Sequence, residues 1–270
     1  MNKTSGQTDP LPADAEPGTD TAVSGIHLFL NSMSRWAKSG RQSYILSCTL
    51  LAILLAYGSS MYLTPGHTYD FDGNAHTARI HMVHKCLEQG HWPLWSNDWY
   101  CGYPLMQFYS PLYFLAGGLM EFLTAEPVLA AKITMYSANI ISGISVYLLA
   151  AMITGNPWSG VLAGIIYALA PWHLFQLMGW GRHPVSLIYA LLPVPLLAYE
   201  CFRNRRVGLI RAAVFAGFAV CLLILAHYGY AVFCVYLFLI CVVLDGRTGP
   251  AAAEPALTLS RRIGFIAVAA

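Results

Sequence analysis

The stretch YILSCTLLAILLAYGSSMYL, residues 44–63, contains no charged side chain and decides the class of fold. A helix needs about 20 consecutive apolar residues to cross the hydrocarbon core of a bilayer. The whole chain follows this pattern, because 57% of its 270 residues are apolar and only 10% are charged, whereas soluble domains carry about 25% charged residues. The sequence therefore predicts an all-α, polytopic membrane protein.

Further apolar stretches of spanning length lie at 128–153, 158–178, 185–202, 208–226 and 228–244. Another begins at Ile263 and is cut off at Ala270, so we expect the N-terminal part of a longer protein. The first span starts too late for a cleaved signal peptide and should act as an uncleaved anchor. Residues 1–24 are rich in Thr, Asp, Pro and Gly. We expect a disordered tail and juxtamembrane segment at 1–42, followed by a membrane domain at 43–270.

The apolar segment 111–123 is too short to span a bilayer and predicts an interfacial helix. With a cytoplasmic N-terminus, this choice leaves most Lys and Arg residues on the cytoplasmic side, as the positive-inside rule requires. Treating 111–123 as a span would instead put the basic cluster at 203–206 outside. Residues 65–127 then form a long extracytoplasmic loop, followed by short loops at 179–184 and 227–229. We expect a multi-pass membrane protein in contact with the lipid bilayer. The net charge of +2 and the lack of a basic run give no reason to expect a nucleic-acid partner.

The long loop opens with the polar stretch DFDGNAHTAR, residues 70–79. We expect a helix from Asp72, at its N-cap, to about Leu87. Asp72, His76 and Arg79 then share one face, and Asp70 can reach the same space. Carboxylates beside a membrane are costly unless they are solvated, paired or bound to a cation. These residues could supply a base or metal ligand beside phosphate-binding cations, or they could only cap the helix and pair locally.

Two further groups of residues are candidates for binding. Trp95 and Tyr109 lie in an aromatic-rich part of the long loop, where such side chains either mark the membrane interface or form a wall for a sugar. Arg182 and His183 stand between apolar segments. Arg182 is either a snorkelling anchor or an anion ligand.

Two other features of the long loop concern cross-linking and metal binding. Cys86 and Cys101 could form a disulfide if the loop is extracytoplasmic. His81 and His84 are three residues apart, but no matching Cys or His pattern follows. We therefore do not favour a zinc site.

Four short motifs follow one another in the long loop: Asp72-x-x-x-His76-x-x-Arg79-Ile80, Gly90-His91-Trp92-Pro93-Leu94-Trp95, Gly102-Tyr103-Pro104 and Tyr109-Ser110-Pro111-Leu112-Tyr113. With the order of span, long loop and interfacial helix, they resemble bacterial membrane proteins of the 6-pyruvoyl-tetrahydropterin synthase-related domain family. That name does not imply pterin chemistry. The resemblance covers about residues 43–230. It implies a likeness to the GT-C superfamily of polyprenyl-phosphate-dependent glycosyltransferases, and therefore a GT-C-like helix bundle. It also implies a location in the bacterial inner membrane.

In GT-C enzymes an acidic residue of the first extracytoplasmic loop acts as the base or as part of a divalent metal site. The matching positions here are Asp72 and Asp70, which would hold a cation such as Mg or Mn if one is used. Oligosaccharyltransferase-like members also carry an acidic pair in the second loop, where this chain has Gly181-Arg182-His183-Pro184. That departure favours a metal-free base or phosphate binding by Arg182.

Two functions follow from these expectations. The first is a membrane glycosyltransferase. A polyprenyl-phosphate-linked sugar would bind with its phosphate near Arg79 and Arg182, and His76 and His183 would help to bind this substrate. Asp72 or Asp70 would deprotonate the acceptor hydroxyl. The second is a non-catalytic protein, either a carrier of lipid-linked sugar or an assembly subunit for cell-envelope polysaccharide. The few charges in the predicted spans argue against an ion-coupled carrier.

Overall fold

The computed structural model describes residues 40–67, 70–98, 101–107, 109–246 and 257–269. The regular structure of this part is helical, and a single isolated bridge joins Ser96 to Tyr103. An all-α polytopic membrane protein is therefore confirmed. The disorder predicted for residues 1–24, and nearly all of the tail assigned to 1–42, lie outside the described residues.

The helices between residues 111 and 243 follow one another with short connections, and a longer loop joins α3 to α4. In chain order they are α2 (Arg41–Gly58), η2 (Ser59–Leu63), α3 (Gly73–Glu88), α4 (Pro111–Thr124), α5 (Pro127–Thr154), α6 (Pro157–Ala168), α7 (Pro171–Met178), α8 (Val185–Leu191), α9 (Pro193–Arg203), α10 (Leu209–Ala226), α11 (Tyr228–Val243) and α12 (Leu259–Ala269).

Five helical segments in the described part are long and apolar enough to cross a membrane: Arg41–Leu63, Pro127–Thr154, Pro157–Met178, Val185–Arg203 and Leu209–Ala226. Each matches a predicted span. The sixth predicted span, 228–244, corresponds to α11, a shorter apolar helix of 16 residues that ends one residue before the predicted end. The outward faces carry large apolar side chains, such as Ile53 at 61% exposure, Phe218 at 60% and Phe233 at 73%. Such surfaces suit lipid.

Proline begins five of these helices and explains breaks that apolar length alone does not predict. A proline at the first helical position loses no hydrogen bond and has a suitable φ angle. Pro171 separates α7 from α6 inside the predicted span 158–178, and Pro193 separates α9 from α8 inside 185–202. The other three are Pro111, Pro127 and Pro157.

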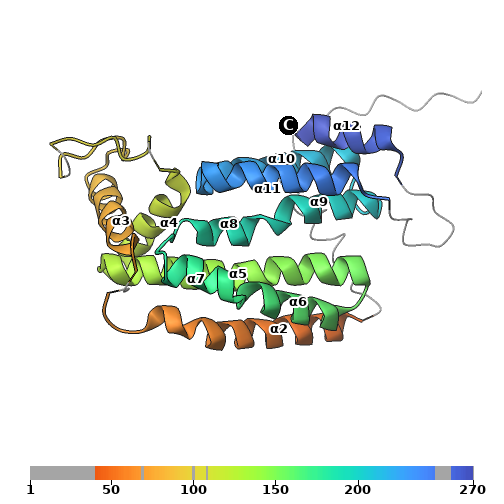
Figure 1. Ribbon diagram of the computed structural model, residues 1–270, viewed down its shortest axis with the longest axis horizontal. Helices are drawn as coiled ribbons and strands as arrows, with labels where there is room; N and C mark the ends of the chain where they lie inside the picture. Colours follow the sequence, from red (N-terminus) through yellow and green to blue (C-terminus); the bar gives the residue numbers. More distant parts are fainter. Residues whose placement is uncertain (1–39, 68–69, 99–100, 108, 247–256, 270) are drawn as a thin grey trace, which may run out of the picture.

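The long helix α5 lies inside the bundle and contacts α2, α3, α4, α6, α8 and α9. Helices α3 and α4 lie across one end of the bundle rather than along it (Figure 1). They pack closely, since a Cβ atom on Gly117 of α4 would lie 2.5 Å from Cδ1 of Ile80 on α3. Segment 111–124 is thus a short helix at the bundle end, consistent with the predicted interfacial helix.

The three loops predicted to share one side of the membrane do meet at this end, which we call the α3 end. Tyr228, at the start of α11, donates its backbone N–H to Ser110 Oγ at 2.9 Å. His183, between α7 and α8, contacts Asp70 just before α3. The connections between α3 and α4, α7 and α8, and α10 and α11 therefore form one surface.

Candidate functional site

Asp70 joins the first loop to the second. Its Oδ1 accepts the backbone N–H of Gly73, the first residue of α3, at 2.6 Å. Its Oδ2 lies 3.0 Å from Nε2 of His183, which donates to it, and the two side chains are 0% and 1% exposed. Both carboxylate oxygens are therefore engaged inside the protein, and the pair fixes residues 113 positions apart in the chain.

The second loop packs against Asp70 through Gly181, which has a φ of +68°. A Cβ atom at this position would lie 2.6 Å from Oδ1 of Asp70 and 2.8 Å from the backbone nitrogen of Asp72. Glycine adopts positive φ without strain and leaves room for this approach. Gly181 thus allows His183 to reach the buried carboxylate.

His76 lies on the inward face of α3 and is 3% exposed. Its ring centroid is 5.6 Å from that of His183, 5.5 Å from that of Tyr109 and 5.7 Å from that of Phe114. Burial lowers the pKa of His76 to about 3, and the neighbouring His183 and Arg79 add to this effect. His76 is therefore a neutral imidazole near pH 7 and contributes packing and polarity rather than charge.

Arg79 lies one turn further along the same face and is 9% exposed. Its guanidinium carbon is 4.1 Å from the ring centroid of Tyr109, a cation–π distance. It also donates to the Tyr103 hydroxyl at 3.5 Å. Tyr109 therefore links Arg79 to His76, and His76 links both to the Asp70–His183 pair.

Arg182 is held by side chains from two helices. Its Nη1 donates to Gln176 Oε1 of α7 at 3.1 Å and to the Tyr230 hydroxyl of α11 at 2.7 Å. Its guanidinium carbon is 5.1 Å from the Trp180 ring centroid. His227, beside Tyr230, has its pKa lowered chiefly by burial and also by Arg182. We call Asp70, His76, Arg79, Arg182 and His183 the loop cluster.

The two other predicted residues lie apart from this arrangement. Asp72 is the N-cap residue of α3 as expected, but its side chain caps nothing and the residue is exposed. Asp70 supplies the capping hydrogen bond instead, and Asp72 does not share the buried face of His76 and Arg79. Trp95 is 56% exposed and donates to Asn97 Oδ1 at 2.9 Å within its own loop.

The donor set around Asp70 does not fit a divalent cation. Its two oxygens are occupied by Gly73 and His183, and Asp72 is exposed while Asp70 is buried. Over the ranges that the structure describes, no three His, Cys, Asp or Glu side chains are grouped as metal ligands would be. Cys86 and Cys101 are both free thiols, so the disulfide that the sequence allows is not formed between them.

Sequence reasoning missed Gln176, Tyr230 and Tyr103 as partners of the two arginines. Gln176 could have been noticed as a polar residue in an apolar segment, since such side chains need a partner in the membrane. Tyr103 and Tyr230 gave no signal beyond aromatic composition, which is common at membrane interfaces.

Comparison with known protein families matches residues 106–251, more than half of the chain, to a family described as 6-pyruvoyl-tetrahydropterin synthase related domain, membrane protein. The matched region includes Arg182 and His183 and begins after α3, so it excludes Asp70–Arg79. No curated protein and no solved structure matches the chain.

Proposed function

The chain belongs to the 6-pyruvoyl-tetrahydropterin synthase related domain family of membrane proteins, and we propose that it acts there as a GT-C-type glycosyltransferase. In this proposal it transfers a sugar from a polyprenyl-phosphate donor to an acceptor on the extracytoplasmic side of the bacterial inner membrane. The α3 end faces that side, with the N-terminus in the cytoplasm. The bias of Lys and Arg toward the opposite end of the bundle supports this orientation.

The observation that carries the proposal is the convergence of two arginines with a buried carboxylate–histidine pair at one end of an apolar bundle. Arg79 comes from α3 and lies over the Tyr109 ring, which contacts His76. His76 in turn contacts the ring of His183, the residue that follows Arg182 in the α7–α8 connection. Arginine is well suited to bind phosphate because its planar fork offers several donors. A phosphate on a lipid would reach this position directly from the bilayer.

Asp72 is the better candidate for the base, and Asp70 is a positioning residue. Asp72 is exposed at the start of α3, two residues after Asp70, where an acceptor hydroxyl could reach it. The acceptor oxygen would form the bond to the anomeric carbon while its proton passes to Asp72. The bond between that carbon and the phosphate oxygen would break, and polyprenyl phosphate would leave with the electron pair toward Arg79 and Arg182. Asp70 would hold His183 and the α3 N-terminus in place.

A second candidate, a non-catalytic carrier or assembly subunit, is favoured by one observation. His76, His183 and the side chain of Asp70 are almost wholly buried, so in this arrangement they cannot touch a substrate. Under this alternative the loop cluster only fastens the loops together.

Transfer of an isotopically labelled sugar from polyprenyl-phosphate hexose donors in membranes tests the proposal. We expect Asp72→Asn to lower kcat by about 10²- to 10⁴-fold, the usual contribution of a general base, with little change in KM for the donor. Asp98→Asn is the matched control, because Asp98 is an exposed loop carboxylate paired with Lys85 at 2.9 Å. Full activity of Asp72→Asn would refute the base assignment. Lack of transfer by the unaltered protein with every donor would favour the non-catalytic alternative.

A further inference from the structure

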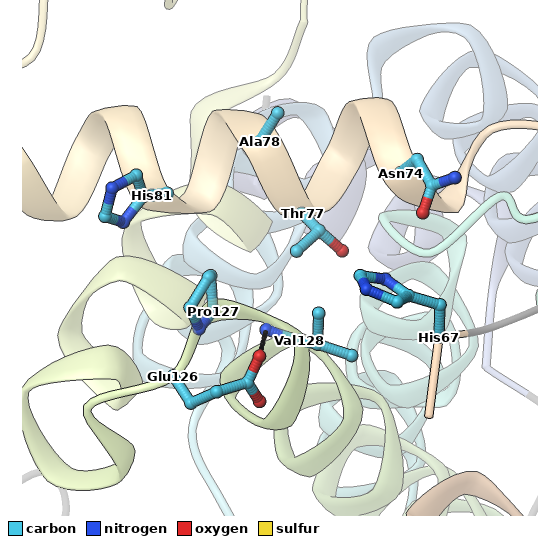
Figure 2. Close-up of a pocket in the computed structure, with 8 residues that line it drawn as sticks. All are labelled: His67, Asn74, Thr77, Ala78, His81, Glu126, Pro127 and Val128. Carbon is cyan, nitrogen blue, oxygen red and sulfur yellow. Dashed lines mark hydrogen bonds between the residues drawn. The ribbon is translucent and has the colours of Figure 1, made fainter. Parts of the chain in front are cut away.

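A cavity of about 500 Å³ lies beside α3 and plays no part in the proposed chemistry. Its walls are His67, Asn74, Thr77, Ala78, His81, Glu126, Pro127 and Val128. Figure 2 shows Thr77 and His81 reaching down from α3 toward His67 and the start of α5. The volume lies within the range of small-molecule sites, roughly 300–1,000 Å³.

The cavity and the loop cluster occupy opposite faces of α3. Asn74, Thr77, Ala78 and His81 recur at helical spacing and line the cavity, whereas His76, Arg79, Ile80 and Val83 form the buried face. An α-helix turns by about 100° per residue, which places the two sets on opposite sides. A ligand in the cavity would therefore lie across the helix from the arginines.

The polar groups of the cavity suit an uncharged ligand rich in hydroxyls. Asn74, Thr77 and the imidazoles can each donate or accept a hydrogen bond. Glu126 caps α5, accepting the N–H groups of Val128 and Leu129, and its carboxylate retains further lone pairs. Neither lysine nor arginine occurs among the described residues of this wall. A carboxylate without a facing cation disfavours a phosphate.

A buried carboxylate fixes the orientation of His81 in the wall. Glu121 of α4 is 3% exposed, and its Oε1 lies 2.7 Å from Nδ1 of His81. The other oxygen, Oε2, is buried and has no hydrogen-bond partner within the described residues. A buried carboxylate needs its partner, so Glu121 holds the ring by Nδ1. Nε2 is thereby left to contact a ligand, and 51% of the side chain is exposed.

We propose that this cavity binds an uncharged carbohydrate, with Asn74, Thr77, His81 and Glu126 contacting its hydroxyl groups. Binding of this kind needs no catalytic activity. The site lies across α3 from Arg79, so it is separate from the donor site of the function proposed above.

Saturation-transfer difference NMR on the purified protein in detergent tests the site. The probes are the methyl α- and β-glycosides of glucose, galactose and mannose, with glucose 1-phosphate as the anionic comparison. We expect at least one methyl glycoside to bind, with affinity about 3- to 10-fold weaker in Thr77→Val because one hydrogen bond is lost. Thr154→Val, at an exposed site at the far end of α5, should bind as the unaltered protein does.

Ala78→Trp provides a second test, because a large side chain on the cavity wall should abolish binding. Thermal unfolding of each variant confirms that it is folded. Lack of binding by all six glycosides, binding that survives Ala78→Trp, or tighter cavity-dependent binding of glucose 1-phosphate would each overturn the proposal. If the protein transfers sugar but binds no glycoside, only the proposed carbohydrate site is refuted. If it binds a glycoside but transfers no sugar, only the proposed glycosyltransferase activity is refuted.

Discussion

Replacing Asp70 with alanine should destabilise the protein far more than the same change at Asp72, two residues away. Asp70→Ala removes the oxygen that caps α3 through Gly73, a loss that typically costs about 1 kcal/mol. It also leaves His183, whose side chain is 1% exposed, without its carboxylate, which costs about 1–3 kcal/mol for a buried polar group. We expect a total of about 3 kcal/mol, or a fall in Tm of roughly 6–12 °C for a chain of this size.

Tryptophan fluorescence during heating in detergent measures this difference. Asp72→Ala is the matched control, because it removes the same charge from an exposed residue that makes no side-chain cap. Its effect should stay within about 0.5 kcal/mol. Equal destabilisation by the two substitutions, or an unchanged Tm in Asp70→Ala, would refute the assignment of the cap and the buried pair to Asp70.

Three other predictions concern the same end of the molecule. Stability should fall as the pH is lowered from 6.5 toward 3, because unfolded His76 gains a proton over this range while the folded imidazole, with its pKa lowered to about 3, stays neutral. His76 contributes at most about 1.4 kcal/mol of unfolding free energy per pH unit. His76→Gln should therefore make Tm depend less steeply on pH, and an equally steep dependence in this variant would contradict the burial of His76. Gly181→Ala should lower Tm by several degrees, because its Cβ would lie 2.6 Å from the Asp70 carboxylate at a φ of +68°; an unchanged melting curve would argue against this packing. Cys86 and Cys101 should both be alkylated without a reductant, and a reductant-dependent mass increase would show that they are paired.

The length of the apolar stretches predicted most of the helices. The expected helix from Asp72 to about Leu87 corresponds to α3 at Gly73–Glu88, and segment 111–123 corresponds to α4. Length did not predict the breaks before Pro171 and Pro193, because the length of an apolar stretch is the same whether or not a proline begins a new helix within it. The stretch 228–244 matches α11 to within one residue, although a helix of 16 residues is shorter than the about 20 that cross a bilayer core.

Helical spacing predicted part of the loop cluster and misplaced one member. His76 and Arg79 share the buried face, as their spacing of three indicates. Asp72 is exposed because the chain enters α3 with the side chain of Asp70, rather than that of Asp72, turned inward to meet Gly73 and His183. That choice depends on the second loop, which lies more than 100 residues away, so no local pattern could have shown it.

Photo-crosslinking tests most directly whether the α3 end binds a polyprenyl phosphate. A polyprenyl phosphate with a photoreactive group near the phosphate would be irradiated with the protein in lipid vesicles, and the labelled peptides identified by mass spectrometry. We predict labelling of α3 and of the connection around Arg182, with at least about tenfold less labelling when Arg79 and Arg182 are both replaced by glutamine. Labelling confined to the opposite end of the bundle, or unchanged by the two substitutions, would contradict the proposed donor site.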